Sequence, residues 1–254
     1  MGVHAVTVSA AQLAEALARV LPAVSTDRKA MVLQCVLVEV VEQSLRLVAT
    51  DRARLVVDEV PLAGGSTPTG FRALVPATAL AAFEAPGSGD VTLRLEDDAV
   101  QVRTEKGMST WPRIQADFPN YEAFLAADPD GMTAVVDRAA LVDAIEEAEG
   151  GSPLRFHFAG DRLEIGEEPP VRVPAQYQGD QGQELTLFLN PTFAHAAAAS
   201  ASGSALVIDA ASPLDPVVIR SADDESHTTV VMPIRSGELD PRQRPRRRRR
   251  PPTT

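Results

Sequence analysis

The chain contains an internal repeat, and this repeat constrains the fold more than any other feature of the sequence. The segment TVSAAQLAEAL at residues 7–17 aligns with VVDRAALVDAI at residues 135–145. Each segment predicts a short strand, a Ser or Asp at a helix N-cap, and then a helix with apolar residues at helical spacing. Two copies of one folding unit are therefore expected, each beginning with a strand and a helix.

Further segments extend the repeat in the same order along both halves. LRLVATD at residues 45–51 parallels LEIGEEP at residues 163–169, and each is expected to be the second arm of a strand pair. ALVPATALAAF at residues 73–83 parallels TLFLNPTFAHA at residues 186–196, where a strand runs through a proline into a second short helix. The two halves thus share several elements and not one isolated motif.

Strand pairs at residues 91–114 and 205–234 close the two halves. Each half is therefore expected to form a β-α-β-β-β unit twice. We predict an α+β protein of two repeated domains, each with two short helices packed on antiparallel sheets. The helices are expected at residues 10–21, 76–84, 138–148 and 191–199.

The predicted domains span residues 1–128 and 129–236, and residues 237–254 are expected to be a disordered tail. The segment at residues 115–132 holds two prolines and several turn formers around an aromatic cluster, which is typical of a linker packed against a domain. The tail has seven arginines among four prolines and no apolar residue after Leu239, so it cannot bury enough surface to offset the entropy of ordering.

The charge is distributed unevenly along the 254 residues. The tail carries seven arginines and two acidic residues, a net charge of +5, so the rest of the chain must carry −16 of the total of −11. An acidic body repels nucleic acid at long range unless its positive charges are gathered on one face. Composition alone therefore does not predict a nucleic-acid-binding body.

Other features exclude several protein classes. The sequence has no run of 18 apolar residues, and its N-terminal apolar stretch has no basic region ahead of it, so neither a membrane span nor a signal peptide is expected. The single cysteine, Cys35, lies in an apolar run and is expected to be a buried structural thiol. A chain with one cysteine suits the reducing cytoplasm, which is the predicted location.

Catalysis has little support in the sequence. The histidines His4, His157, His195 and His227 are scattered, and no metal-ligand spacing or phosphate-binding glycine loop occurs. Acidic runs such as EDD at residues 96–98 are expected to be solvated loops. No catalytic residue, metal site or cofactor is therefore predicted, and the chain is not expected to be an enzyme.

Five motifs, in the correct order, resemble those of the bacterial DNA polymerase III beta subunit, the replicative sliding clamp. They are LVATDRARLVV at residues 47–57, FPNY at 118–121, LFLNPTF at 187–193, SPLDPVVI at 212–219 and TTVVMPIR at 228–235. The resemblance spans residues 5–236 and covers the central and C-terminal domains of that family, without its N-terminal domain. It implies the DNA clamp fold.

The resemblance also implies a function. It indicates a non-catalytic, sliding-clamp-like accessory protein of DNA replication or repair, which docks polymerase-type partners by short linear motifs. The alternative is a divergent peptide-binding regulator that forms no ring and does not encircle DNA. A clamp of this family surrounds duplex DNA with six similar domains, so a chain of two domains would close such a ring as a homotrimer.

The family binds motifs of the form Gln-x-x-Leu-x-Phe in a pocket between the two resembled domains, and such a pocket needs an apolar floor with a few polar groups. Carried over position by position, the resemblance implies a partner-peptide set, which consists of Leu33, Thr50, Arg54, Leu55, Pro119, Asn190, Phe193, Leu214, Pro216, Val230, Met232, Pro233 and Arg235.

In the stretch LRLVATDRARLVV, the resemblance implies that Thr50 and Asp51 shape the end of a hairpin through side-chain to backbone hydrogen bonds. Leu55 would then face the pocket and Arg54 would stand at its rim. Arg52 replaces a glycine that is frequent in the family. The simpler interpretation is that Thr-Asp only ends a strand.

The family also presents the two helices of each domain to the DNA, where Lys and Arg contact phosphates. In the four predicted helices, the basic residues are Arg19 and Arg138 alone, beside several carboxylates. The tail adds a second group of candidate nucleic-acid contacts, namely Arg246, Arg247, Arg248, Arg249 and Arg250. A tail that only aids solubility is an equally good interpretation.

Overall fold

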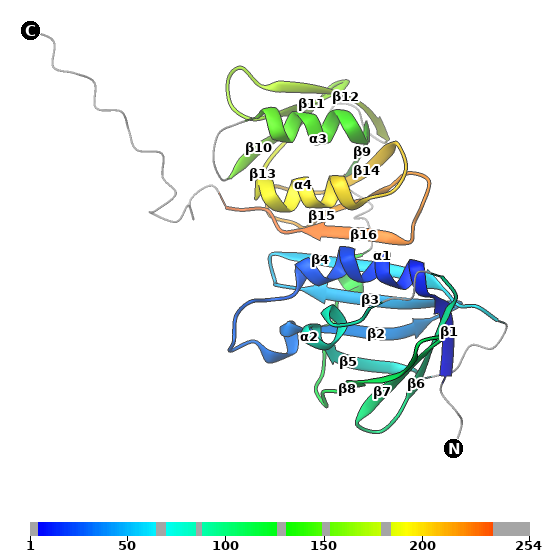
Figure 1. Ribbon diagram of the computed structural model, residues 1–254. Coiled ribbons are helices and arrows are strands. Elements are labelled where there is room, and N and C mark those ends of the chain that lie inside the picture. The colour runs from blue at the N-terminus through cyan, green and yellow to red at the C-terminus, as the bar shows by residue number, and fades with distance from the viewer. Residues whose placement is uncertain are drawn as a thin grey trace, which may run out of the picture. The chain divides into compact units, whose positions relative to one another are not determined.

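A computed structural model of the chain describes residues 5–64, 70–84, 88–125, 131–148, 153–178 and 184–235 (Figure 1). The chain divides into two compact units. Unit 1 comprises Met1–Ala126, Ser200–Ser202 and Asp223–Val230, and unit 2 comprises Ala127–Ala199, Gly203–Ala222 and Val231–Thr254. The predicted domain boundary after residue 128 and the predicted disordered tail both lie outside the described residues.

Unit 1 contains two successive β-α-β-β-β segments. The first consists of β1 (Ala5–Ser9), α1 (Ala10–Val20), β2 (Cys35–Val41), β3 (Ser44–Thr50) and β4 (Arg54–Pro61). The second consists of β5 (Arg72–Pro76), α2 (Ala77–Ala81), β6 (Asp90–Leu95), β7 (Ala99–Thr104) and β8 (Gly107–Pro112). One antiparallel sheet has the order β1-β6-β7-β8, and the other runs β5-β2-β3-β4.

Unit 2 repeats this element order. Its first segment consists of β9 (Met132–Asp137), α3 (Arg138–Glu147), β10 (Leu154–Ala159), β11 (Arg162–Ile165) and β12 (Val171–Gln178). The second consists of β13 (Leu185–Leu189), α4 (Pro191–Ser200), β14 (Ala205–Ala210), β15 (Val217–Ser221) and β16 (His227–Val231). Residues 227–230 of β16 belong to unit 1, where this strand follows β4 in the sheet. The predicted α+β architecture of two repeated domains is confirmed.

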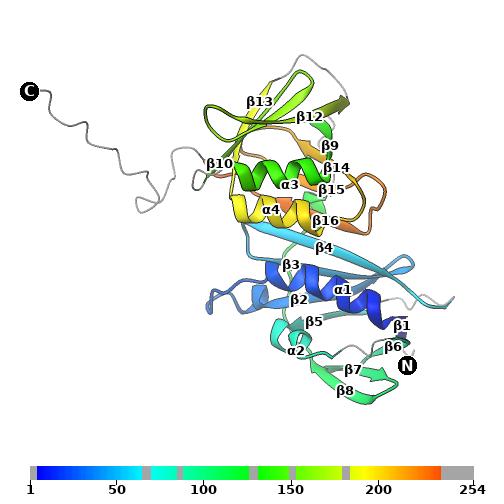
Figure 2. The ribbon, with the colours of Figure 1, turned by 45° about the horizontal axis from the view of Figure 1, so that its top comes forward.

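The cores follow from the alternation and helical spacing seen in the sequence. In unit 1, α1 buries Leu13, Leu17 and Val20 among inward-facing residues of both sheets, such as Leu47 and Leu93. In unit 2, α3 and α4 lie side by side (Figure 2), and His195 Nε2 lies 2.8 Å from Glu146 Oε1 between them. Because α4 faces inward with Ala194, Ala197 and Ala198, it packs closely.

The predicted helix at residues 76–84 is shorter than expected, since α2 ends at Ala81. The backbone N–H of Phe83 donates to Leu80 O (3.1 Å), which tightens the last turn. The Phe83 ring then packs edge-on against Trp111, with ring centroids 5.5 Å apart. This aromatic contact with β8 competes with continued helix, and local propensity did not reveal it.

The segment expected to be a packed linker does lie against unit 1. Phe118 and Tyr121 are buried with their rings in edge contact. The Tyr121 hydroxyl donates to Glu39 Oε1 and accepts from Arg46 Nη1 (3.1 Å). Burial, together with the Glu39 carboxylate, raises the pKa of Tyr121 to about 12. The hydroxyl therefore stays protonated and holds residues 118–121 on β2 and β3.

Candidate functional site

The turn between β3 and β4 is built by the Thr-Asp pair. Thr50 Oγ1 donates to Arg54 O (2.7 Å) and accepts from the backbone N–H of Arg52 (3.1 Å). Asp51 Oδ1 accepts from the backbone N–H groups of Ala53 (3.0 Å) and Arg54 (2.9 Å). The side chains therefore hold the turn as expected, and Thr-Asp does more than end a strand.

The backbone conformation of Arg52 is a reason for the many side-chain hydrogen bonds in this turn. Its φ is +78°, in the left-handed region that favours glycine, and a non-glycine residue there costs on the order of 1 kcal/mol. The hydrogen bonds of Thr50 and Asp51 offset that strain. The same bonds leave the carboxylate of Asp51 free to accept from Arg54 Nε (3.1 Å), so the turn also positions an arginine.

Arg54 extends the turn toward the end of α1. Its Nη2 donates to the carbonyl of Pro22, which follows α1 in a 3-10 turn at Leu21–Ala23. The adjacent Leu55 is 6% exposed and pairs with Thr50 across the hairpin. The turn therefore presents a fixed guanidinium beside an apolar strand residue.

Six members of the predicted partner-peptide set lie in unit 1. Thr50, Arg54 and Leu55 form the hairpin just described, and Leu33 is buried in the 3-10 turn before β2. The remaining two are Pro119, which is exposed, and Val230, which is buried in β16. The structure thus brings the hairpin residues together.

The other seven members of the set lie in unit 2. Asn190 directly precedes α4, where its side-chain oxygen accepts from the N–H of Thr192 (2.9 Å), and the N–H of Phe193 donates to Asn190 O (3.0 Å). Leu214 is 54% exposed in a turn that Ser212 and Asp215 hold by a 2.6 Å hydrogen bond. The remaining members are Pro216, Met232, Pro233 and Arg235, of which the first three are half-buried and the last is exposed.

The two arginines predicted to face nucleic acid both bond to groups of the protein itself, although both side chains are partly exposed. Arg19 donates to Asp58 through Nε (2.6 Å) and Nη2 (2.9 Å), and this hydrogen-bonded carboxylate raises the pKa of Arg19. Arg138 Nε donates to Gly203 O (2.8 Å). Exposed carboxylates, by contrast, lie on α1 (Glu15) and α3 (Asp143, Glu146 and Glu147). The arginines of the tail, Arg246 to Arg250, lie outside the described residues.

A buried polar cluster in unit 1 was not predicted from the sequence. Asp58 on β4 is fully buried and also accepts from His227 Nδ1 (2.8 Å) on β16. His227 Nε2 lies 3.0 Å from Ser200 Oγ and 3.3 Å from Thr229 Oγ1. The aspartate interrupts an apolar strand between Val57 and Val60, and this interruption was the only signal available in the sequence.

Within the described part of the chain, no group of three or more His, Cys, Asp or Glu side chains could hold a metal ion. No helix among those residues has the length and apolar character needed to cross a membrane. Cys35 is a buried free thiol whose pKa is raised by that burial.

Comparison with known proteins identifies relatives of both units. Residues 7–120 match the family described as DNA polymerase III beta subunit, central domain. The beta sliding clamp of Streptomyces coelicolor is 26% identical over 252 residues, a match that covers 90% of this chain and 66% of that protein. The resemblance stated from the sequence motifs is therefore confirmed.

Solved structures have the same fold. A DNA polymerase III beta subunit from Thermotoga maritima has a TM-score of 0.80 at 21% identity and covers 92% of this chain. The DNA polymerase sliding clamp from Bacillus subtilis has a TM-score of 0.76 at 19% identity, again over 92% of this chain. The chain spans 66% and 64% of the lengths of these two proteins. The predicted DNA clamp fold is confirmed.

Proposed function

We propose that this chain, which resembles the central and C-terminal domains of the DNA polymerase III beta subunit, is a non-catalytic, sliding-clamp-like accessory protein of DNA replication or repair. Its partners would be polymerases or other proteins that carry a short apolar clamp motif. The proposal rests chiefly on the hairpin at Thr50–Leu55, whose hydrogen bonds present Arg54 and Leu55 together.

The chemistry of the partner-peptide set supports peptide docking. Within unit 2, Leu214 and Met232 supply apolar surface from two different segments, and Asn190 supplies a polar group whose position is fixed by a hydrogen bond. Leu214 is more than half exposed although it is a large apolar side chain. A peptide with Leu and Phe side chains would cover such surface.

Peptide binding tests this proposal. A peptide of the form Gln-x-x-Leu-x-Phe should bind with a dissociation constant on the order of 1–10 μM. Met232→Asp and Leu214→Asp should each weaken binding at least about tenfold, because a carboxylate would then face the apolar peptide side chains. Titration of a fluorescent peptide measures the effect.

Two matched variants control this titration. Met108→Asp changes another methionine, 70% exposed on β8, that is not in the set, and it should leave peptide affinity unchanged. Met232→Leu keeps the apolar side chain and should retain binding. Equal affinity for Leu214→Asp, Met232→Asp and the parent chain would place the peptide site elsewhere.

A ring that encircles duplex DNA is the further part of the proposal, and it would need three copies of two such domains. The alternative is a peptide-binding regulator that forms no ring and does not encircle DNA. The internal bonds of Arg19 and Arg138, and the exposed carboxylates on α1 and α3, favour the alternative. Helices of this charge would not hold a duplex by counterion release.

The tail supplies a direct test of DNA binding. If its seven arginines carry the interaction, affinity should fall with salt at a log-log slope of up to about −6, and deletion of residues 237–254 should abolish it. Fluorescence anisotropy with a short duplex, at several salt concentrations, gives both quantities. If DNA binding were undiminished after the deletion, the helices and not the tail would carry the interaction.

A further inference from the structure

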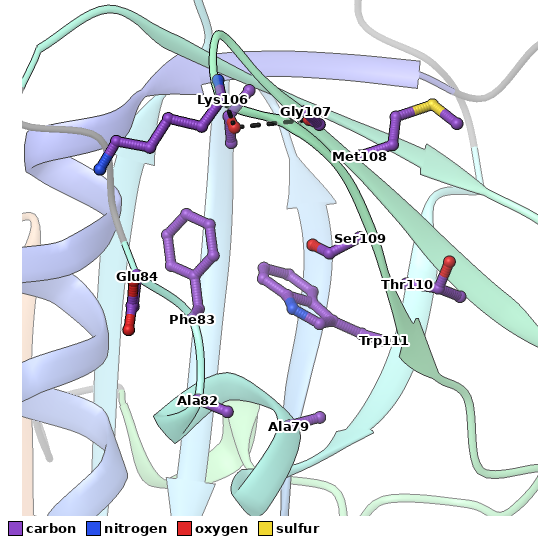
Figure 3. A pocket seen from close by; sticks show the side chains of 11 residues that line it. Ala79, Ala82, Phe83, Glu84, Lys106, Gly107, Met108, Ser109, Thr110 and Trp111 are labelled. Carbon is purple, nitrogen blue, oxygen red and sulfur yellow. Dashed lines mark hydrogen bonds between the residues drawn. The ribbon is translucent and has the colours of Figure 1, made fainter.

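Two pockets of unit 1 are each lined in part by an exposed methionine. The Met108 pocket lies beside β8 and has a volume of about 440 Å³, and Phe83 and Trp111 face each other in it (Figure 3). The Met31 pocket has a volume of about 430 Å³ and lies between the loop that follows α1 and the start of α2. Met108 is 70% exposed and Met31 is 69% exposed. The two pockets are therefore matched in size and in one side chain.

The linings of the two pockets differ in charge. Apolar residues from three segments line the Met31 pocket, namely Val24, Met31, Cys35, Pro76, Ala77 and Ile114. Arg28 is the only charged residue among the described residues that line it, whereas the Met108 pocket has both Glu84 and Lys106. An apolar wall with a single cation at its rim favours an apolar side chain that has an acidic group beside it.

The loop between α1 and β2 holds the wall of the Met31 pocket in place. The N–H of Ser25 donates to Leu33 O (2.8 Å), and Asp27 Oδ1 accepts from the N–H of Lys29 (2.9 Å). Gln34 Nε2 donates to Asp27 O (2.7 Å), which closes the loop on itself. A wall that is already ordered lowers the entropy cost of binding a ligand.

The same loop joins the Met31 pocket to the partner-peptide set. Leu33 belongs to the set and lies in the 3-10 turn before β2, and Met31 and Gln34 of that turn line the pocket. Arg54, also in the set, donates to the carbonyl of Pro22 at the start of the loop. Successive residues of a 3-10 turn rise by about 2 Å, and an extended chain advances about 3.3 Å per residue. A peptide held at Leu33 would therefore reach the pocket with an extension of a few residues.

We infer that the Met31 pocket is a further subsite for partner proteins, which receives an apolar side chain outside the clamp motif, next to an acidic residue that pairs with Arg28. The inference rests on the proposed peptide docking and defines the partner's chemistry beyond the motif. A guanidinium pairs well with a carboxylate. The arginine-rich tail of this chain is unsuitable as the occupant, because Arg28 would repel it.

Three fluorescent peptides test the subsite. The first is the bare motif Gln-x-x-Leu-x-Phe, and the other two carry Leu-Glu beyond a Gly-Ser spacer at the N-terminal or the C-terminal end. One extended peptide should bind the parent chain about tenfold more tightly than the bare motif, because it buries an additional leucine side chain. The other extension points away from the pocket and should bind as the bare motif does.

Substitutions at the two matched methionines locate the gain in affinity. Met31→Asp should abolish the gain, because a carboxylate would face the leucine of the extension, and it should leave the affinity for the bare motif unchanged. Met31→Leu keeps an apolar side chain and should retain the gain. Met108→Asp makes the same change in the Met108 pocket and should also retain it. Circular dichroism checks that each variant is folded.

A charge reversal tests the role of Arg28. Arg28→Glu should reduce the gain severalfold, and an extension with Leu-Lys in place of Leu-Glu should restore it in this variant. A loss caused by altered packing of the loop would not be restored by a change of charge in the peptide. Recovery therefore reports pairing between residue 28 and the flank of the peptide.

Three results would overturn the inference while leaving the proposed docking intact, since the bare motif binds in each of them. They are equal affinity of all three peptides for the parent chain, a gain that survives in Met31→Asp, and a gain that is lost equally in Met108→Asp. Failure of the bare motif to bind the parent chain would instead overturn the proposed function, and this inference with it.

Discussion

Replacement of Asp58 by alanine is expected to lower the free energy of unfolding of unit 1 by about 3–5 kcal/mol. Asp58 is fully buried, and it accepts two hydrogen bonds from Arg19 and one from His227. Its removal leaves the Arg19 guanidinium without its counter-charge and the buried Nδ1 of His227 without its hydrogen-bond partner. Trp111 is the only tryptophan and lies in the core of unit 1, so its fluorescence during urea denaturation reports this unit.

The neighbouring Glu59 provides a matched control. Its side chain is 27% exposed and pairs with Arg46 at 2.7 Å. A partly exposed pair of this kind contributes about 0–1 kcal/mol, so Glu59→Ala should shift the unfolding midpoint far less. Equal losses of unfolding free energy in the two variants would mean that the buried Asp58 cluster stabilises the fold no more than the partly exposed pair of Glu59 and Arg46.

Phe71→Ala is expected to cost about 3–5 kcal/mol by the same fluorescence measurement. Phe71 is 1% exposed, and it belongs to the core cluster that contains Leu13, Leu93 and Trp111. Truncation to alanine removes the transfer free energy of the ring and leaves a cavity that the surrounding strands fill only partly. Its backbone bond to Val40 N–H (2.9 Å) remains possible in the variant, so the loss reports packing.

Phe124→Ala is the control for this substitution. Phe124 is 44% exposed in the 3-10 turn at Glu122–Phe124, and its truncation should change stability by no more than about 0.5 kcal/mol. A loss for Phe71→Ala as small as that for Phe124→Ala would contradict the assignment of Phe71 to a tightly packed core.

The sequence by itself determined the element order and the fold class. Alternation in segments such as LRLVATD and helical spacing in AAQLAEALARV identify strands and a helix, because each periodicity puts its apolar residues on one buried face. The repeat of these patterns in the second half predicted two similar domains. The Thr-Asp pair also predicted a turn held by side chains, because short polar side chains reach nearby backbone N–H groups.

Contacts between residues distant in the sequence were decided only by the tertiary structure. The pairing of Asp58 with Arg19 and His227 joins positions 39 and 169 residues apart, and no local pattern encodes it. The same contact pairs Arg19, a candidate nucleic-acid residue, with a buried carboxylate of unit 1. The ring contact of Phe83 with Trp111, just beyond the end of α2, likewise joins residues that are distant in the sequence. Periodicity reports which face of an element is buried, whereas partners across the fold are chosen by packing that involves the whole chain.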